Sequence, residues 1–123
     1  FNRKNFIYAI DTNLMPSIND FKDLPIQMAI AHTMLLSTEL QIATKHSALI
    51  SLDISHNGKD EIQFYKQIKK WGFAGMMICD DIHLNKEMEL FWALVTEPKY
   101  DLTDVGHVTG TGLIDFSGEV KIV

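Results

Sequence analysis

Two apolar segments flank an amphipathic one in the middle of the chain, and this arrangement constrains the fold more than any other feature. Ser47–Leu52 and Ala74–Cys79 have the composition of buried strands. Between them, Lys59–Trp71 carries apolar side chains at helical spacing, and Gly72 suits the end of that helix. Buried strands that alternate with amphipathic helices predict an α/β fold. We expect a Rossmann-like, mostly parallel sheet with helices on both faces.

The segment before the first buried strand extends this alternation. Asn5–Ile10 has the composition of a β-rich strand that ends at Asp11, and Leu35–Lys45 has the apolar spacing of a helix. Between these two, Pro25–His32 fits either a short strand or the start of a helix. The N-terminal part therefore predicts at least one more strand and one more helix.

The C-terminal part predicts a helix followed by closely spaced strands. Asn85 suits the N-cap of this helix, and Pro98 follows its end. The closing segments with strand character are Leu102–Val108, Leu113–Phe116 and Val120–Val123, the last two joined by a turn at Ser117-Gly118. Because they lie too close together for helical crossovers, they predict an antiparallel hairpin at one edge of the sheet.

Composition and charge bound the class of protein. The 123 residues are 46% hydrophobic and contain no repeat or linker-like segment, so we expect a single domain over residues 1–123. The net charge of −5 and the lack of a Lys/Arg cluster argue against nucleic acid as the main partner. No segment approaches the ~18 apolar residues of a membrane helix, so no membrane partner is expected. The single cysteine, Cys79, suits a reducing compartment, and we expect the protein in the cytoplasm.

Acidic side chains follow the two buried strands where each strand ends. Asp53 comes directly after the first strand, and Asp80 and Asp81 come directly after the second. Neighbouring strands lie about 4.8 Å apart, so carboxylates at the ends of adjacent parallel strands can converge. Converging carboxylates repel and need a cation, and hard oxygen ligands favour Mg²⁺, Mn²⁺ or Ca²⁺ over Zn²⁺. The alternative is that Asp81 caps a turn while the other two are solvated loop residues.

Two of the five histidines, His56 and His83, lie on the same predicted rim as the carboxylates. Because imidazole titrates near neutrality, either could act as a general base, and the alternative for each is a surface or capping histidine. No pair of histidines has zinc spacing. Asp11 ends the first strand, where an acidic residue holds ribose hydroxyls in nucleotide-binding α/β folds.

The segment Gly106–Gly112 has the glycine content of a phosphate-binding loop but not its context. A strand rather than a helix follows it, and no Lys-Ser/Thr pair comes after the glycines. We therefore expect Gly110 and Gly112 to mark a tight connection or a bulge next to the sheet edge.

Taken in order, these motifs resemble the second half of a class I S-adenosylmethionine (SAM)-dependent methyltransferase. The segments Leu52–His56 and Gly72–Asp81, with the helix and the antiparallel strand pair that follow, carry the resemblance. Asp80–Asn85, Phe91-Trp92 and Gly106–Gly112 are similar to uncharacterised proteins of the same superfamily. They are most similar to the metal-dependent O-methyltransferases, including cephalosporin-hydroxylase-like and macrolide-sugar types. The resemblance covers residues 6–116, and the segments around Asp53 and Asp80-Asp81 carry most of its specificity.

The resemblance implies methyl transfer from SAM to a hydroxyl of a small molecule or sugar. The implied metal ligands are Asp53, Asp80 and Asp81. A cation such as Mg²⁺ held there would lower the pKa of the acceptor's hydroxyl and orient it. His56 or His83 would act as the base. Asp11 and Asp53 are the implied cofactor-binding residues, with Asp11 on the cofactor ribose.

One departure from the family concerns its glycine-rich loop, which belongs to the strand before the acidic strand end. If Phe6–Asp11 is the second strand of the family's sheet, that loop is absent from this sequence. The chain also begins with Phe1 rather than Met. Three arrangements follow: a fragment truncated at its N-terminus, which we favour; a rearranged sheet with Phe6–Asp11 in the central slot; or a partner chain that fills the gap.

Two further functions remain open at this point. The first is a non-catalytic methyltransferase-like scaffold that acts through assembly, which predicts a homo-oligomer covering an exposed sheet edge. The second is a receiver-like domain with a Mg²⁺-assisted aspartyl-phosphate site. That fold places its acidic pair early in the chain and its lysine after a later strand, whereas here the order is reversed and Lys121 lies within a closing strand. We therefore rank the receiver-like interpretation last.

Overall fold

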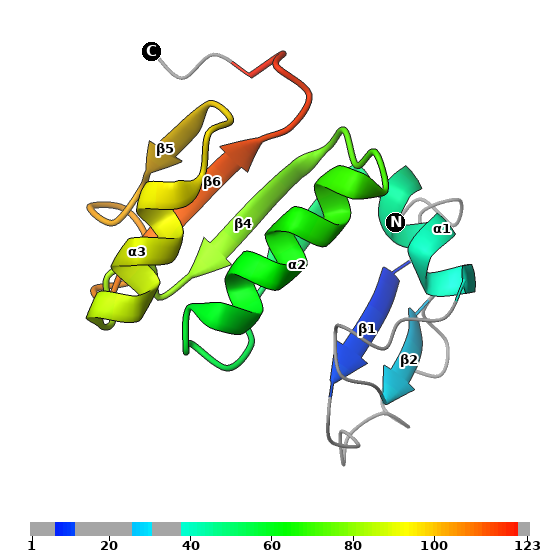
Figure 1. The fold of residues 1–123 in the computed structure, drawn as a ribbon, viewed down its shortest axis with the longest axis horizontal. Helices are drawn as coiled ribbons and strands as arrows, with labels where there is room; N and C mark the ends of the chain where they lie inside the picture. Colours follow the sequence, from blue (N-terminus) through cyan, green and yellow to red (C-terminus); the bar gives the residue numbers. More distant parts are fainter. Residues whose placement is uncertain (1–6, 12–25, 31–37, 121–123) are drawn as a thin grey trace. The chain divides into compact units, whose positions relative to one another are not determined.

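The computed structural model describes residues 7–11, 26–30 and 38–120 (Figure 1). The chain divides into two compact units, Phe1–Ala43 and Thr44–Val123, and each is considered by itself. In the first unit, β1 (Ile7–Asp11) pairs in parallel with β2 (Ile26–Ile30). The strand predicted from the β-rich N-terminal segment is therefore confirmed over its described residues, and the ambiguous segment Pro25–His32 contains a second strand.

Helix α1 (Thr38–His46) follows and leads into the second unit. It overlaps the helix expected over Leu35–Lys45, and the part of that segment before Thr38 lies outside the described residues. No helix in the described part of the chain is long and apolar enough to cross a membrane.

The second unit is built on a four-stranded sheet with the order β3-β4-β6-β5. Its strands are β3 (Leu49–Leu52), β4 (Met76–Asp80), β5 (Lys99–Asp101) and β6 (Thr111–Asp115). The β3–β4 pair is parallel, whereas β6 runs antiparallel to both β4 and β5. The α/β class is therefore confirmed, with an open mixed sheet in which the parallel character is limited to one pair.

Two helices cover one face of this sheet, α2 (Lys59–Lys70) and α3 (Lys86–Leu94), and they lie on the same side of it (Figure 1). The sheet contributes buried side chains to the core, with Met77 and Ile114 at 0% exposure. Other apolar strand residues are exposed to solvent: Leu49 is 51% exposed and Ile78 is 37% exposed. A helical layer on both faces, as the sequence predicts, is thus not seen among residues 44–120.

The ends of both helices follow from local side-chain chemistry. Asn57 Oδ1 accepts the backbone N–H of Asp60 at the start of α2, and Gly72 adopts a φ of 80° just after the C-cap of that helix. At α3, the side chain of Asn85 accepts the backbone N–H of Met88 at 2.8 Å, which confirms the expected N-cap. These caps set where each connection leaves the helix and returns to the sheet.

The closing strands differ from the sequence prediction. Leu102–Val108 was expected to be a strand, but the hairpin is made by β5 and β6, and residues 102–110 form the connection between them. The reason is a tight turn, because the carbonyl of Leu102 accepts the backbone N–H groups of Val105 and Gly106. An antiparallel hairpin at one edge of the sheet is confirmed. Its strand β6 overlaps the strand expected over Leu113–Phe116, whereas β5 lies in a segment that was not predicted as a strand.

The turn predicted at Ser117-Gly118 is confirmed as a bend, but the strand predicted over Val120–Val123 is not formed at Val120. The carboxylate of Asp115 accepts the backbone N–H groups of Ser117, Gly118 and Val120, which turns the chain away from the sheet. Val120 lies in no strand, and residues 121–123 lie outside the described part of the chain.

The buried thiol of Cys79 gives a test of this core. Cys79 is 1% exposed on β4, and burial, followed by the nearby charge of Glu61, raises the pKa of its thiol to about 12. Because the thiolate is the reactive form, we expect the folded protein to resist a thiol reagent at about pH 8 and to react fully in denaturant. Rapid reaction of the folded chain would contradict this packing.

Candidate functional site

The carboxyl ends of β3 and β4 lie at the same edge of the sheet. Leu52 pairs with Cys79, so Asp53, which follows β3, and Asp80, the last residue of β4, lie at this edge. Strand β6 runs the other way and pairs Thr111 with Asp80. The connection that precedes β6 therefore reaches the same edge, which is where ligands bind in open α/β sheets.

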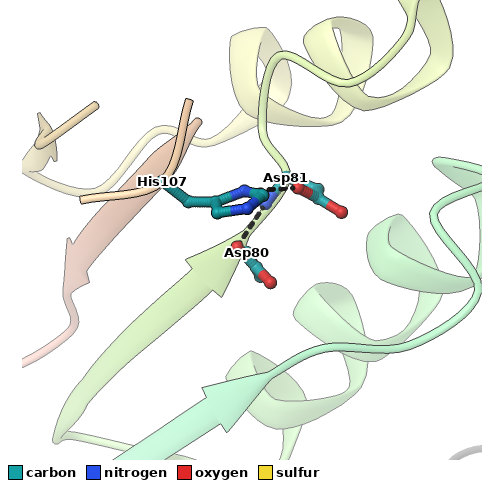
Figure 2. A group of neighbouring side chains, drawn as sticks. All are labelled: Asp80, Asp81 and His107. Carbon is teal, nitrogen blue, oxygen red and sulfur yellow. Dashed lines mark hydrogen bonds and ion pairs between the residues drawn. The ribbon is translucent and has the colours of Figure 1, made fainter. Parts of the chain in front are cut away.

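Three side chains from two of these segments form a cluster. Asp80, Asp81 and His107 each offer one ligand atom, and these atoms lie within 4.8 Å of one another. Figure 2 shows the ring of His107 reaching from the connection before β6 toward the end of β4. Its Nδ1 lies 3.3 Å from Asp81 Oδ1, and the Asp81 backbone N–H donates to Asp80 Oδ1 at 3.0 Å.

Asp81 is the centre of the interactions in this cluster. Its side chain is 15% exposed and accepts a hydrogen bond from the hydroxyl of Thr109. This hydrogen bond lowers the pKa of the Asp81 carboxyl; burial opposes the shift, and the nearby His56 and His107 add to it. The Asp81 backbone also has a φ of 57°, which a non-glycine residue rarely adopts.

His56 links the predicted ligand Asp53 to this cluster. Its Nε2 lies 3.2 Å from Asp53 Oδ1 and 3.4 Å from Asp81 Oδ2, yet it makes no hydrogen bond to either. Asp53 is 64% exposed and stands outside the group of three. The structure thus brings Asp80 and Asp81 together directly and Asp53 only through His56.

His83, the second predicted base, interacts with a different carboxylate. Its Nε2 lies 2.7 Å from Asp101 Oδ2, and its backbone N–H donates to the carbonyl of Thr109 at 2.8 Å. Hydrogen bonds from Thr103 and from His83 lower the pKa of Asp101 to about 2. His83 is thus tied to the connection that carries His107 and has no ion pair with Asp80 or Asp81 among the contacts of the described residues.

Two glycines, Gly110 in this connection and Gly112 in β6, let the chain approach its neighbours closely. Gly110 has a φ of 109°, and a Cβ there would lie 2.7 Å from the backbone nitrogen of His83. A Cβ at Gly112 would lie 2.6 Å from the ring of Trp92. A tight connection is thus found at Gly110, whereas Gly112 lies within β6. The close approach at Gly110 holds the segment that carries His107 against the residues after β4.

His107 was not assigned to the site by the sequence analysis. Its position depends on the antiparallel pairing of β6 with β4, which returns the Gly106–Gly112 segment to Asp80 and which no local sequence pattern signals. The remaining predicted site residue, Asp11, ends β1 as expected. Its side chain lies outside the described residues, so its part in cofactor binding stays a prediction.

Comparison of the chain with protein-family models, with curated proteins and with solved structures finds no match.

Proposed function

We propose that the carboxyl edge of β3 and β4 binds a divalent cation and uses it to activate a hydroxyl group of a small molecule or sugar. The observation that carries the proposal is the cluster of Asp80, Asp81 and His107, whose ligand atoms lie within 4.8 Å of one another. Two neighbouring carboxylates repel each other. A bound cation would offset that repulsion and would also accept the lone pair of the imidazole.

The donor set suits a particular group of cations. Carboxylate oxygens favour Mg²⁺, Ca²⁺ and Mn²⁺, whereas an imidazole nitrogen is a better ligand for Mn²⁺ and later transition metals. The mixed set of two carboxylates and one histidine therefore supports Mn²⁺ over Mg²⁺. The lowered pKa of Asp81 supports the same proposal, because a ligand carboxyl must be ionised to bind metal.

The chemistry follows from the groups around the cluster. A bound divalent cation supplies a Lewis acid that lowers the pKa of a coordinated hydroxyl. The Nε2 atom of His56 is within ion-pair distance of the carboxylates of both Asp53 and Asp81. His83 Nε2 lies instead against Asp101, away from the cluster, so His56 is the base that we propose.

The reaction that we propose is methyl transfer from SAM to the activated hydroxyl. Its support is the sequence resemblance of Leu52–His56 and Gly72–Asp81 to class I methyltransferases, together with the parallel pair β3–β4, whose ends carry the carboxylates. Asp11 and Asp53 are the proposed cofactor contacts. The location that we propose is the cytoplasm.

Calorimetric titration of the full chain tests both parts of the proposal. We expect one Mn²⁺ to bind per chain, more tightly than Mg²⁺, and SAM to bind in a separate titration. If neither cation binds to the folded chain, the metal-assisted mechanism is wrong. Cation binding without SAM binding would keep the metal site and contradict methyl transfer.

A scaffold that acts through assembly is the second candidate. It is supported by β3, which is an edge strand of the four-stranded sheet and carries Leu49 at 51% exposure. An apolar edge strand favours association with another chain. A monomer by sedimentation that binds both SAM and Mn²⁺ would contradict this alternative.

A further inference from the structure

A buried carboxylate lies in the first turn of α2, outside the residues assigned to the site. Glu61 is 1% exposed, which is unusual for a glutamate. Its Oε1 accepts the backbone N–H of His56 at 2.7 Å, and its Oε2 has no hydrogen-bond partner among the described residues. Burying a carboxylate costs free energy unless it is paired, so we ask what the contact with His56 does.

The peptide groups of His56 are held from two directions. While Glu61 accepts its N–H, the side-chain amide of Asn85 donates to its carbonyl at 2.9 Å. Asn85 is also the N-cap of α3. Residues at the starts of two different helices therefore hydrogen-bond to His56, one to its backbone N–H and the other to its backbone carbonyl.

The backbone of His56 needs such support. Its φ is 54°, in the left-handed region that residues with a Cβ rarely adopt. In this conformation, its imidazole Nε2 lies within 3.4 Å of both Asp53 and Asp81. A relaxed backbone at this residue would turn the ring away from these carboxylates.

We propose that Glu61 and Asn85 are positioning residues that hold His56 in the left-handed conformation and so aim its imidazole at Asp53 and Asp81. We call these two hydrogen bonds to the His56 backbone the clamp. Its role in catalysis rests on the proposed metal-assisted function. The clamp itself is a property of the metal-free chain and is measured there. Neither residue needs to touch a substrate for this role.

Nuclear magnetic resonance of the full chain tests the clamp without metal. In the wild type, we expect the His56 amide proton to be shifted downfield and protected from exchange, because it donates to a carboxylate at 2.7 Å. Glu61→Leu removes the acceptor and should abolish both effects. Glu61→Gln keeps an acceptor of the same shape and should restore most of the protection.

A second measurement reads the direction of the His56 ring. With Mn²⁺ bound, paramagnetic broadening of the His56 ring signals should be weaker in Glu61→Leu than in the wild type, when each is compared with the His107 ring. The affinity for Mn²⁺ should fall about 10-fold, as for other outer-shell changes. Asn85→Ser removes the hydrogen bond to the His56 carbonyl and keeps a good N-cap for α3. If Glu61→Leu fails to fold, this variant should show the same decrease in His56 broadening and in Mn²⁺ affinity.

Glu87→Gln is the matched control, because it removes an exposed first-turn carboxylate from α3. It should leave the His56 signals unchanged. An unchanged His56 amide and ring in Glu61→Leu or in Asn85→Ser would overturn the clamp. If the wild type binds no Mn²⁺, the proposed function fails, while the amide measurement still decides the clamp.

Discussion

Replacing Asp81 by asparagine is expected to weaken Mn²⁺ binding by more than about 100-fold, since loss of a ligand should exceed the effect of outer-shell changes, which is roughly 10- to 100-fold. Asparagine tolerates the left-handed backbone that Asp81 adopts and can still accept the Thr109 hydroxyl. The substitution therefore removes the negative charge with little change in shape. Calorimetric titration of Mn²⁺ into the variant measures the loss.

The matched control for this prediction is Asp104→Asn, an exposed aspartate in the connection that carries His107. It makes the same change of charge away from the cluster and should bind Mn²⁺ as the wild type does. His107→Ala should reproduce the loss in Asp81→Asn, because the two side chains belong to the same cluster. If Asp81→Asn binds Mn²⁺ as tightly as the wild type, Asp81 is not a ligand of the bound cation.

The second large effect is expected at Phe91, in the core that supports the site. Phe91 is 0% exposed in α3 and packs edge-on against Tyr65 of α2, with ring centroids 6.4 Å apart. Phe91→Ala should lower the free energy of unfolding by about 3–5 kcal/mol, the usual loss for a large buried aromatic. Because natural domains are stable by only about 5–15 kcal/mol, the variant should be close to unfolding.

Leu90→Ala is the control for this substitution, since Leu90 precedes Phe91 on the same helix and is 57% exposed. A surface change of this kind should alter the free energy of unfolding by no more than about 0.5 kcal/mol. Denaturant titration followed by tryptophan fluorescence compares the two variants. Equal losses would mean that α3 does not pack against α2 through Phe91.

The central strand–helix–strand segment could be predicted closely from sequence. The helix expected over Lys59–Trp71 spans Lys59–Lys70, and the strand expected over Ala74–Cys79 spans Met76–Asp80. Such elements depend on the periodicity of nearby apolar residues and on caps such as Asn85, and both are local in the chain. Agreement is therefore best where the pattern is strongest.

Of the C-terminal strands, β6 overlaps the strand predicted over Leu113–Phe116, but its partner could not be placed in this way. Leu102–Val108 has apolar residues that suit a strand, but the backbone hydrogen bonds of Leu102 close a turn instead. The strand that forms, β5, is only three residues long and depends on pairing with β6. Pairing between segments distant in sequence overrides a local preference of this strength.

The sequence by itself determined the α/β class and the position of Asp80 and Asp81 at the end of a buried strand, because both depend on local patterns. Only the tertiary structure decided which side chains join them. It brought His107 to Asp81 by antiparallel pairing of β6 with β4, linked Asp53 to the cluster only through His56, and tied His83 to Asp101. The physical reason is that a site forms from contacts between distant segments, and those contacts depend on strand order and direction, which local periodicity does not encode.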